Sequence, residues 1–331
     1  MANPDEPRLP PELERRIFEI AAVSDPESIA RSVGLVAKRV WAWTEPIIYR
    51  TVVVSSMNEK TGVAAAILRH LDSGASGKPP SFFAQHVHNF SLVPSFWLFM
   101  GARPSPNAWK PAELARVVRA CTGVKNFSFM GSFRPLSAKE NHLGDALDAW
   151  RPRKILMLAD GPAQFAEYAT DPVFRDVTHL LLTTMSSASD PDYVFDRADN
   201  LHALARLPKL RHLAVVVQMP TPVLVQLLSA PLQLETLVLF GAENCTTELV
   251  GIEDDRVVIL HEEENILADW QEAVKGNPDL WDRAEEFIRG KRRGEIESER
   301  FVSTGGKQID RSLILLLLHH TGRAYHHRRQ P

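Results

Sequence analysis

Short apolar segments recur along the middle of the chain, each able to form a strand whose alternate side chains point inward. They span residues 87–93, 124–131, 153–158, 177–183, 210–217, 234–241 and 256–261, after a β-branched run at 51–54. Between them lie segments with apolar residues at helical spacing, such as 111–120, 193–204 and 222–228. Because helices and strands alternate, the pattern predicts an α/β fold of parallel strands joined by crossover helices.

The strands repeat at intervals that suit a leucine-rich array. Aligned on Phe90, Phe127, Ile155, Leu180, Leu213, Leu237 and Val258, they have successive spacings of 37, 28, 25, 33, 24 and 21 residues. Several of these spacings fall within the leucine-rich-repeat period of roughly 20 to 29 residues, and the longer ones indicate inserted loops. We therefore predict an irregular leucine-rich-repeat-like solenoid over residues 55–261.

The outward positions of several strands leave a second architecture open. Leu156, Leu181, Val216 and Val238 are apolar, although an open solenoid would expose them on its concave face. In that arrangement they are candidate substrate-binding residues. A closed α/β sheet with helices on both faces would bury them instead.

Residues 1–54 are predicted to form a small bundle of three helices. Pro10 precedes a helix whose apolar positions follow one face: Leu13, Ile17, Ile20 and Ala21. A second helix begins near Asp25 and Pro26, and a third continues until Pro46, which we expect to disturb it. Because so few residues make only a small core, we expect the bundle to pack against the next domain or a partner protein.

The C-terminal part changes character twice. Apolar residues set among carboxylates and interrupted at Pro278 predict two short helices within residues 262–293, which would cap the array. Residues 294–331 lack periodicity, and we expect a disordered basic tail there. The charge changes as well, since residues 245–288 contain 3 basic and 13 acidic residues whereas residues 289–331 contain 10 basic and 4 acidic ones.

Composition excludes several classes of protein. The 331 residues are 44% hydrophobic and carry a formal charge of −3, so we expect a folded core, no nucleic-acid partner and no membrane partner. Two cysteines provide neither a disulfide framework nor a metal tetrad. We find no secretory signal, and the longest apolar run, residues 313–318, is far shorter than the roughly 20 residues of a membrane span. We expect an intracellular protein of the cytoplasm, the nucleus or both.

The sequence lacks the usual catalytic motifs. It contains no glycine-rich nucleotide cradle and no G-x-S-x-G nucleophile elbow. His261 precedes three glutamates, but Asn265 stands where a zincin has its second histidine. His86 and His88 share one face of a strand without a third ligand nearby. We therefore expect no catalytic residue, metal or cofactor, and a protein that is not an enzyme; an α/β enzyme with an unrecognised site is an alternative.

The N-terminal segment resembles the F-box, which opens with LPxEL and later carries an LVC-[KR]-R-x-W-like segment. Here residues 9–13 read LPPEL and residues 35–41 read LVAKRVW. Residues 46–52, PIIYRTV, look like the PLLYRTV ending of many fungal F-box-like proteins, in which a divergent leucine-rich array follows. Residues 269–285 are also similar to the end of those proteins, so the resemblance covers residues 9–293.

The resemblance implies a substrate receptor of an SCF-type cullin-RING ubiquitin ligase. Its helices would bind a Skp-type adaptor, and through it a cullin, while the repeats hold a protein target of unknown identity. The adaptor surface would consist of Leu9, Pro10, Leu13, Ile17 and Val36, although Leu13, Ile17 and Val36 could instead form the internal core of the bundle. Ala37, where many F-boxes have Cys, and a longer interval between the two motifs favour an alternative, an interaction scaffold uncoupled from the ligase.

Overall fold

The chain folds as two compact units, Met1–Leu234 and Glu235–Pro331. Their boundary lies inside the predicted repeat array. The computed structural model describes residues 9–32, 37–55, 60–73, 77–93, 109–130, 142–159, 165, 169–184, 198–216, 221–230, 232–241, 254–261, 266–296 and 302–303.

Three helices at the start of the first unit pack on one another, as predicted: α1 (Pro11–Ser24), α2 (Pro26–Ser32) and α3 (Lys38–Ile48). Proline occupies the first position of α1 and of α2, where its missing N–H would be unpaired anyway. Asp25 caps α2, because its Oδ1 accepts a hydrogen bond from the Ser28 N–H at 2.9 Å. The expected disturbance at Pro46 does not end α3, which continues for two more residues.

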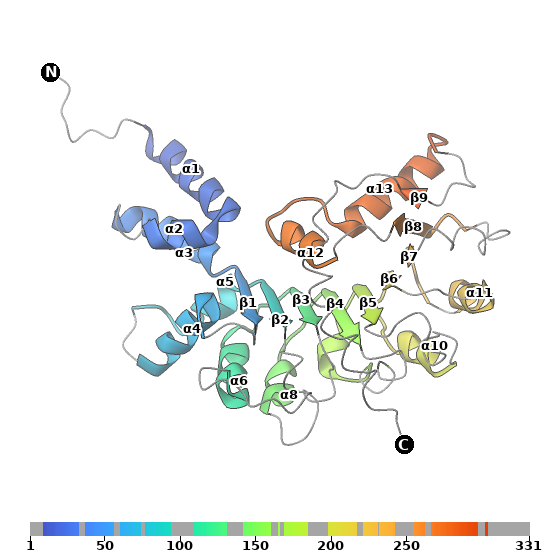
Figure 1. Cartoon of the computed structure of the whole chain (residues 1–331), viewed down its shortest axis with the longest axis horizontal. Helices are drawn as coiled ribbons and strands as arrows, with labels where there is room; N and C mark the ends of the chain where they lie inside the picture. Colours follow the sequence, from blue (N-terminus) through green and yellow to red (C-terminus); the bar gives the residue numbers. More distant parts are fainter. Residues whose placement is uncertain are drawn as a thin grey trace, which may run out of the picture. The chain divides into compact units, whose positions relative to one another are not determined.

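Six parallel strands of the first unit pair in the order in which they occur in the chain (Figure 1). They are β1 (Thr51–Ser55), β2 (Asn89–Val93), β3 (Asn126–Met130), β4 (Lys154–Ala159), β5 (His179–Thr184) and β6 (His212–Val216). Phe90, Phe127, Ile155, Leu180 and Leu213 are register partners, which is the alignment predicted from the repeat for these strands. Residues 51–54 belong to this sheet, although we predicted them as the end of the helical domain.

Helices connect these strands and complete the α/β architecture. They are α4 (Gly62–Ser73), α5 (Phe82–His86), α6 (Pro111–Ala120), α8 (His142–Leu147), the short 3₁₀ helix η3 (Pro172–Phe174) and α10 (Ala198–Ala205), and α11 (Thr221–Ser229) follows β6. In Figure 1, α4, α6, α8 and α10 lie along the lower side of the sheet. α6 contacts both α4 and α8, so neighbouring connections form a continuous helical layer.

The core of the first unit lies between this helical layer and the sheet, and large aromatic side chains fill part of it. Trp150 is fully buried, and its ring meets Phe90 and Phe127 edge to face at centroid distances of 5.0 and 5.3 Å. Its indole N–H donates to the Val118 carbonyl at 3.1 Å, so the polar atom of this buried ring is paired. Burial of these rings ties β2, β3 and α6 together.

The second unit contains β7 (Thr236–Gly241), β8 (Val257–His261), β9 (Val302–Ser303), α12 (Ile266–Val274) and α13 (Leu280–Arg292). The three strands are parallel, and α13 packs against β7 and β8. Leu237 pairs with Val257, so the predicted alignment of Leu237 with Val258 is wrong by one residue. In the tail expected to be disordered, the structure describes two residues beyond 296, which pair with β8 as β9.

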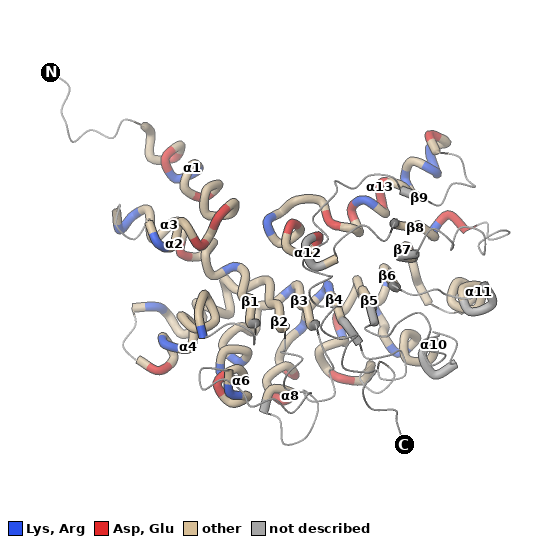
Figure 2. Tube along the Cα trace, viewed as in Figure 1, with Lys and Arg blue, Asp and Glu red and all other residues tan. Residues whose placement is uncertain are grey.

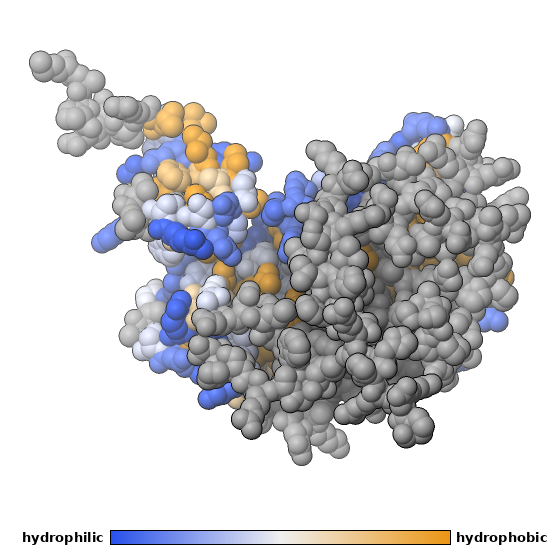
Figure 3. Space-filling view, in the orientation of Figure 1, coloured by the Kyte–Doolittle hydropathy of each residue, from blue (hydrophilic) through white to orange (hydrophobic). Residues whose placement is uncertain are grey.

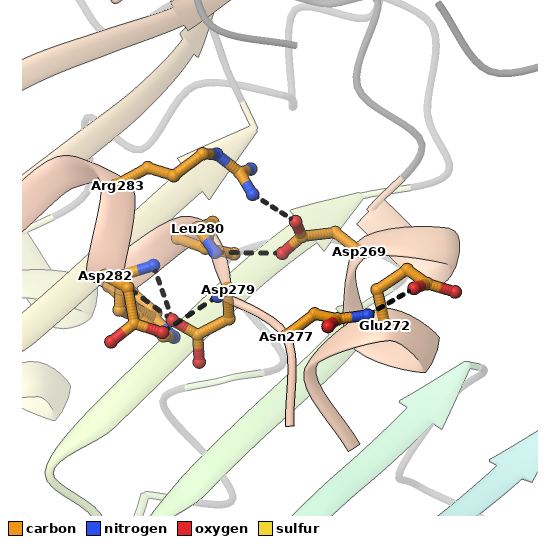
Figure 4. Close-up of polar contacts among 8 residues, drawn as sticks. Asp269, Glu272, Asn277, Asp279, Leu280, Asp282 and Arg283 are labelled. Carbon is orange, nitrogen blue, oxygen red and sulfur yellow. Dashed lines mark hydrogen bonds and ion pairs between the residues drawn. The ribbon is translucent and has the colours of Figure 1, made fainter. Parts of the chain in front are cut away.

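The two helices predicted after the strands are confirmed, and Figure 4 shows how their junction is held. Asp279 caps α13, since its Oδ1 accepts from the N–H groups of Trp281 and Asp282 at 2.9 and 3.0 Å. One carboxylate oxygen of Asp269 pairs with Arg283 at 2.6 Å, and the other accepts from the Leu280 N–H at 3.0 Å. These bonds fix the start of α13 against α12.

None of the helices that the structure describes combines the length and the apolar character that crossing a membrane requires.

Candidate functional site

An exposed apolar face on α1 is the first candidate site. Leu13, Ile17 and Ile20 lie on the helix at spacings of four and three residues, which place them on one side, and Leu9 lies just before the helix. Their exposed fractions are 45%, 55%, 53% and 53%. Figure 3 shows hydrophobic colour gathered over this helix. A run of large apolar side chains in water is typical of a surface that binds another protein.

The opposite side of α1 holds the helix in place. Ala22 is fully buried, and α1 contacts both α2 and α3. Arg39 of α3 donates to both carboxylate oxygens of Glu14 at 2.9 and 3.0 Å, so the two helices are also joined by an ion pair. Ala22 and the Glu14–Arg39 ion pair thus hold α1 against its neighbours, while Leu13, Ile17 and Ile20 remain exposed.

The structure brings together two of the predicted adaptor-binding residues. Leu13 and Ile17 share the exposed face of α1, and Leu9 and Pro10 lie exposed just before the helix. Since Leu13 and Ile17 are exposed, they do not form the internal core of the bundle, which was the alternative interpretation. Val36 lies outside the described residues. Ile20 extends the face, and its helical spacing was the signal that could have included it in the prediction.

The predicted substrate-binding positions on the strands are not exposed. Leu156, Leu181 and Val238 are all buried, so the structure offers no free surface at these residues. Val216 belongs to β6, and its side chain lies outside the described set. The sequence could not show this, because apolar positions on both faces of a strand fit burial and ligand binding equally well.

On the same face of the sheet, polar side chains form a hydrogen-bonded row at the start of the strands. The Asn126 Nδ2 donates to the Asn89 Oδ1 at 2.7 Å, and the Asn89 Nδ2 donates to the Thr51 Oγ1 at 3.0 Å. We call these three residues the amide row. Two residues further along their strands, the hydroxyls of Ser91 and Ser128 are buried and have no hydrogen-bond partner in the part of the chain that the structure describes.

Positive charge gathers at the rim where these strands begin. One residue immediately before each strand forms a column, the basic rim: Arg50, His88, Lys125, Arg153, Thr178 and Arg211. Backbone hydrogen bonds join each of these residues to the next, with N···O distances of 3.0, 2.8, 2.8, 2.9 and 3.0 Å. Figure 2 shows blue segments along the upper end of the sheet, where the strands begin. The repeat spacing did not predict this column, because it was aligned on apolar positions.

Three cations of the basic rim face water without an acidic partner among the residues that the structure describes. Arg50, Lys125 and Arg153 are exposed, and no carboxylate pairs with any of them among the described residues. The pKa of His88, between Arg50 and Lys125, is lowered mainly by burial and further by the charges of Lys125 and Arg50, although a hydrogen bond to the Gln85 carbonyl opposes the shift. A neutral His88 leaves the net charge of the rim to its lysine and arginines.

Burial or ring contacts account for several other side chains that are capable of chemistry. Burial raises the pKa of the Cys121 thiol to about 12, so it is not a nucleophile at neutral pH. His86 lies against the Phe82 ring, with centroids 4.6 Å apart. The rings of His179 and His212 stack across neighbouring strands, with centroids 4.0 Å apart. The repeat alignment places these two histidines in register, but we did not predict their contact.

No family model matches the chain, and no curated protein matches it significantly in sequence.

Proposed function

We propose that this chain is an F-box-like substrate receptor of an SCF-type cullin-RING ubiquitin ligase. In this proposal α1 binds a Skp-type adaptor, which connects the chain to a cullin, and the strands and helices that follow hold a protein target. The observation that carries the proposal is the exposed apolar surface of Leu9, Leu13, Ile17 and Ile20, which includes three of the five residues that the F-box resemblance assigns to the adaptor, Leu9, Leu13 and Ile17.

The energetics of this face suit a protein partner. Full burial of a leucine or isoleucine is worth about 1.5–3 kcal/mol, so a half-exposed one retains on the order of 1 kcal/mol for binding. Three such side chains on a preformed helix, with Leu9 just before it, can be buried in one groove without ordering a new segment, as in other helix-in-groove complexes. The parallel strands in sequential order, with helices between them, support an array that presents a target.

The test is binding of the full chain to a purified Skp-type adaptor, measured by calorimetry. We expect wild type to bind and the double variant Leu13→Ser/Ile17→Ser to lose at least about tenfold in affinity, because two anchors of the face are removed. The matched control is Glu12→Ser/Arg16→Ser, which changes two exposed residues of the same helix at the same spacing and also keeps the net charge. It should bind as wild type does.

Failure of wild type to bind, while an established F-box protein binds the same adaptor preparation, would overturn the receptor proposal. That result would favour the uncoupled scaffold, in which α1 binds a different protein. Equal loss in the two double variants would show that α1 acts through its stability rather than through its apolar face.

A further inference from the structure

We propose that the basic rim binds an extended acidic segment of a protein. This inference deepens the proposed function, since it names the class of target that the receptor would hold. Only the delivery of that target to a ubiquitin ligase rests on the proposed function. Binding itself needs nothing but this chain, so it can be tested without the adaptor.

The register of the sheet sets the spacing of the charges. Neighbouring strands lie about 4.8 Å apart, so the five intervals from Arg50 to Arg211 span about 24 Å. An extended peptide rises about 3.3 Å per residue, so about seven residues would cover the column. The rim is therefore a row of six positions, four of them cationic, with the length of a short linear segment.

The chemistry of the rim suits carboxylates. The column contains three arginines, one lysine and no acidic residue. Arg50, Lys125 and Arg153 are exposed and have no carboxylate partner within the described residues, so binding breaks no ion pair at these positions. Arginine can bind a carboxylate through two parallel hydrogen bonds, which gives the contact direction as well as charge.

Two features favour an acidic peptide over nucleic acid. Over the first three strands the basic rim is only one residue wide. The next position on each of these strands belongs to the neutral amide row of Thr51, Asn89 and Asn126. Nucleic-acid sites neutralise many phosphates, and those for single strands add aromatic platforms. The formal charge of the whole chain is −3, so no overall field attracts a polyanion.

The experiment measures binding of a fluorescein-labelled octaglutamate peptide to the full chain by fluorescence anisotropy at low ionic strength. We expect binding that weakens as salt is added, and no binding of the matching octaglutamine peptide. The variant Lys125→Glu/Arg153→Glu, which reverses two adjacent charges of the rim, should weaken octaglutamate binding by at least about tenfold.

The matched control is Arg69→Glu/Arg206→Glu, which makes the same change of charge at two exposed arginines of the first unit outside the rim. It should change the affinity by less than about twofold if the effect is local. Thermal unfolding of both variants, followed by circular dichroism, checks that each still folds.

Three outcomes would overturn the inference: no octaglutamate binding by wild type, equal weakening by the two variants, or tighter binding of a labelled DNA duplex than of the peptide with loss in the rim variant. The last would identify a nucleic-acid surface. If the chain binds the peptide but not the adaptor, the inference about the basic rim is supported and the receptor proposal is wrong. If it binds the adaptor but not the peptide, the receptor proposal is supported and the inference about the basic rim is wrong.

Discussion

Helices α1 and α6 carry similar apolar stripes, but the stripe of α6 is buried and that of α1 is exposed. On α6, Leu114, Val117 and Val118 are buried, and the helix contacts α4 and α8 in the layer that covers the sheet. On α1, Leu13 and Ile17 are exposed although the helix contacts α2 and α3. An amphipathic pattern thus identifies a helix that needs a partner, but it does not say whether that partner belongs to the same chain.

The largest expected difference between the two helices is in the free energy of unfolding after a charge is introduced. Val117→Asp places a carboxylate at a fully buried position and should cost about 3–5 kcal/mol. Leu13→Asp places the same group at an exposed position near a helix N-terminus and should change stability by less than about 0.5 kcal/mol. Urea unfolding followed by circular dichroism measures both. A large loss in Leu13→Asp would mean that the α1 face is covered within the chain.

A smaller effect tests the packing of the turn that follows α6. A Cβ on Gly123 would lie 1.9 Å from the Ala84 carbonyl oxygen, so Gly123→Ala must move backbone and should cost about 2 kcal/mol. Gly77→Ala is the control, because a Cβ there meets nothing within 4 Å and its effect should stay within about 0.5 kcal/mol. Thermal unfolding of the two variants distinguishes them, and equal melting temperatures would contradict the close approach.

The smallest expected effect concerns Glu113 in the first turn of α6. Burial raises its pKa, but hydrogen bonds from the Lys60 ammonium and the Lys110 N–H lower it more, so the net pKa lies below the usual value. The folded state therefore favours the ionised form. This contribution is present above the unfolded pKa of about 4 and is lost as the pH falls through the lowered folded value.

Glu113→Gln should accordingly cost about 1 kcal/mol at pH 7, and the difference from wild type should shrink below about pH 4. Glu12→Gln, in the first turn of α1, is the counterpart on the exposed helix and should cost less than about 0.5 kcal/mol. Chemical unfolding at a series of pH values tests the pair. A penalty at Glu113 that stays constant down to pH 2 would show that the carboxylate charge is not its source.

The strands and their register in the first unit could be predicted because one face of each strand meets the same helical layer. Phe90, Phe127 and Ile155 occupy equivalent places in a repeated pattern, so aligning the pattern aligned the sheet. The prediction is wrong by one residue at β8. In β2 to β7 the aligned apolar residue directly follows a polar one, as Leu237 follows Thr236, and by the same rule the partner of Leu237 is Val257, which follows Arg256.

The candidate sites were predictable to different degrees. Leu13 and Ile17 could be placed on one side of a helix from their spacing, but their exposure depends on what the rest of the chain leaves uncovered. Lys125 and Arg153 are separated by 28 residues and look unrelated in the sequence. Only the backbone hydrogen bond between their strands makes them neighbours, and a pattern of apolar residues contains no information about such charges.

The sequential order of the strands has a consequence for how the chain is made. From β2 to β6, every strand pairs with the strand that precedes it, so its partner already exists when a ribosome releases it. The first unit can therefore grow one repeat at a time from its N-terminal end during translation, and no strand needs to wait for a distant segment before it is sheltered.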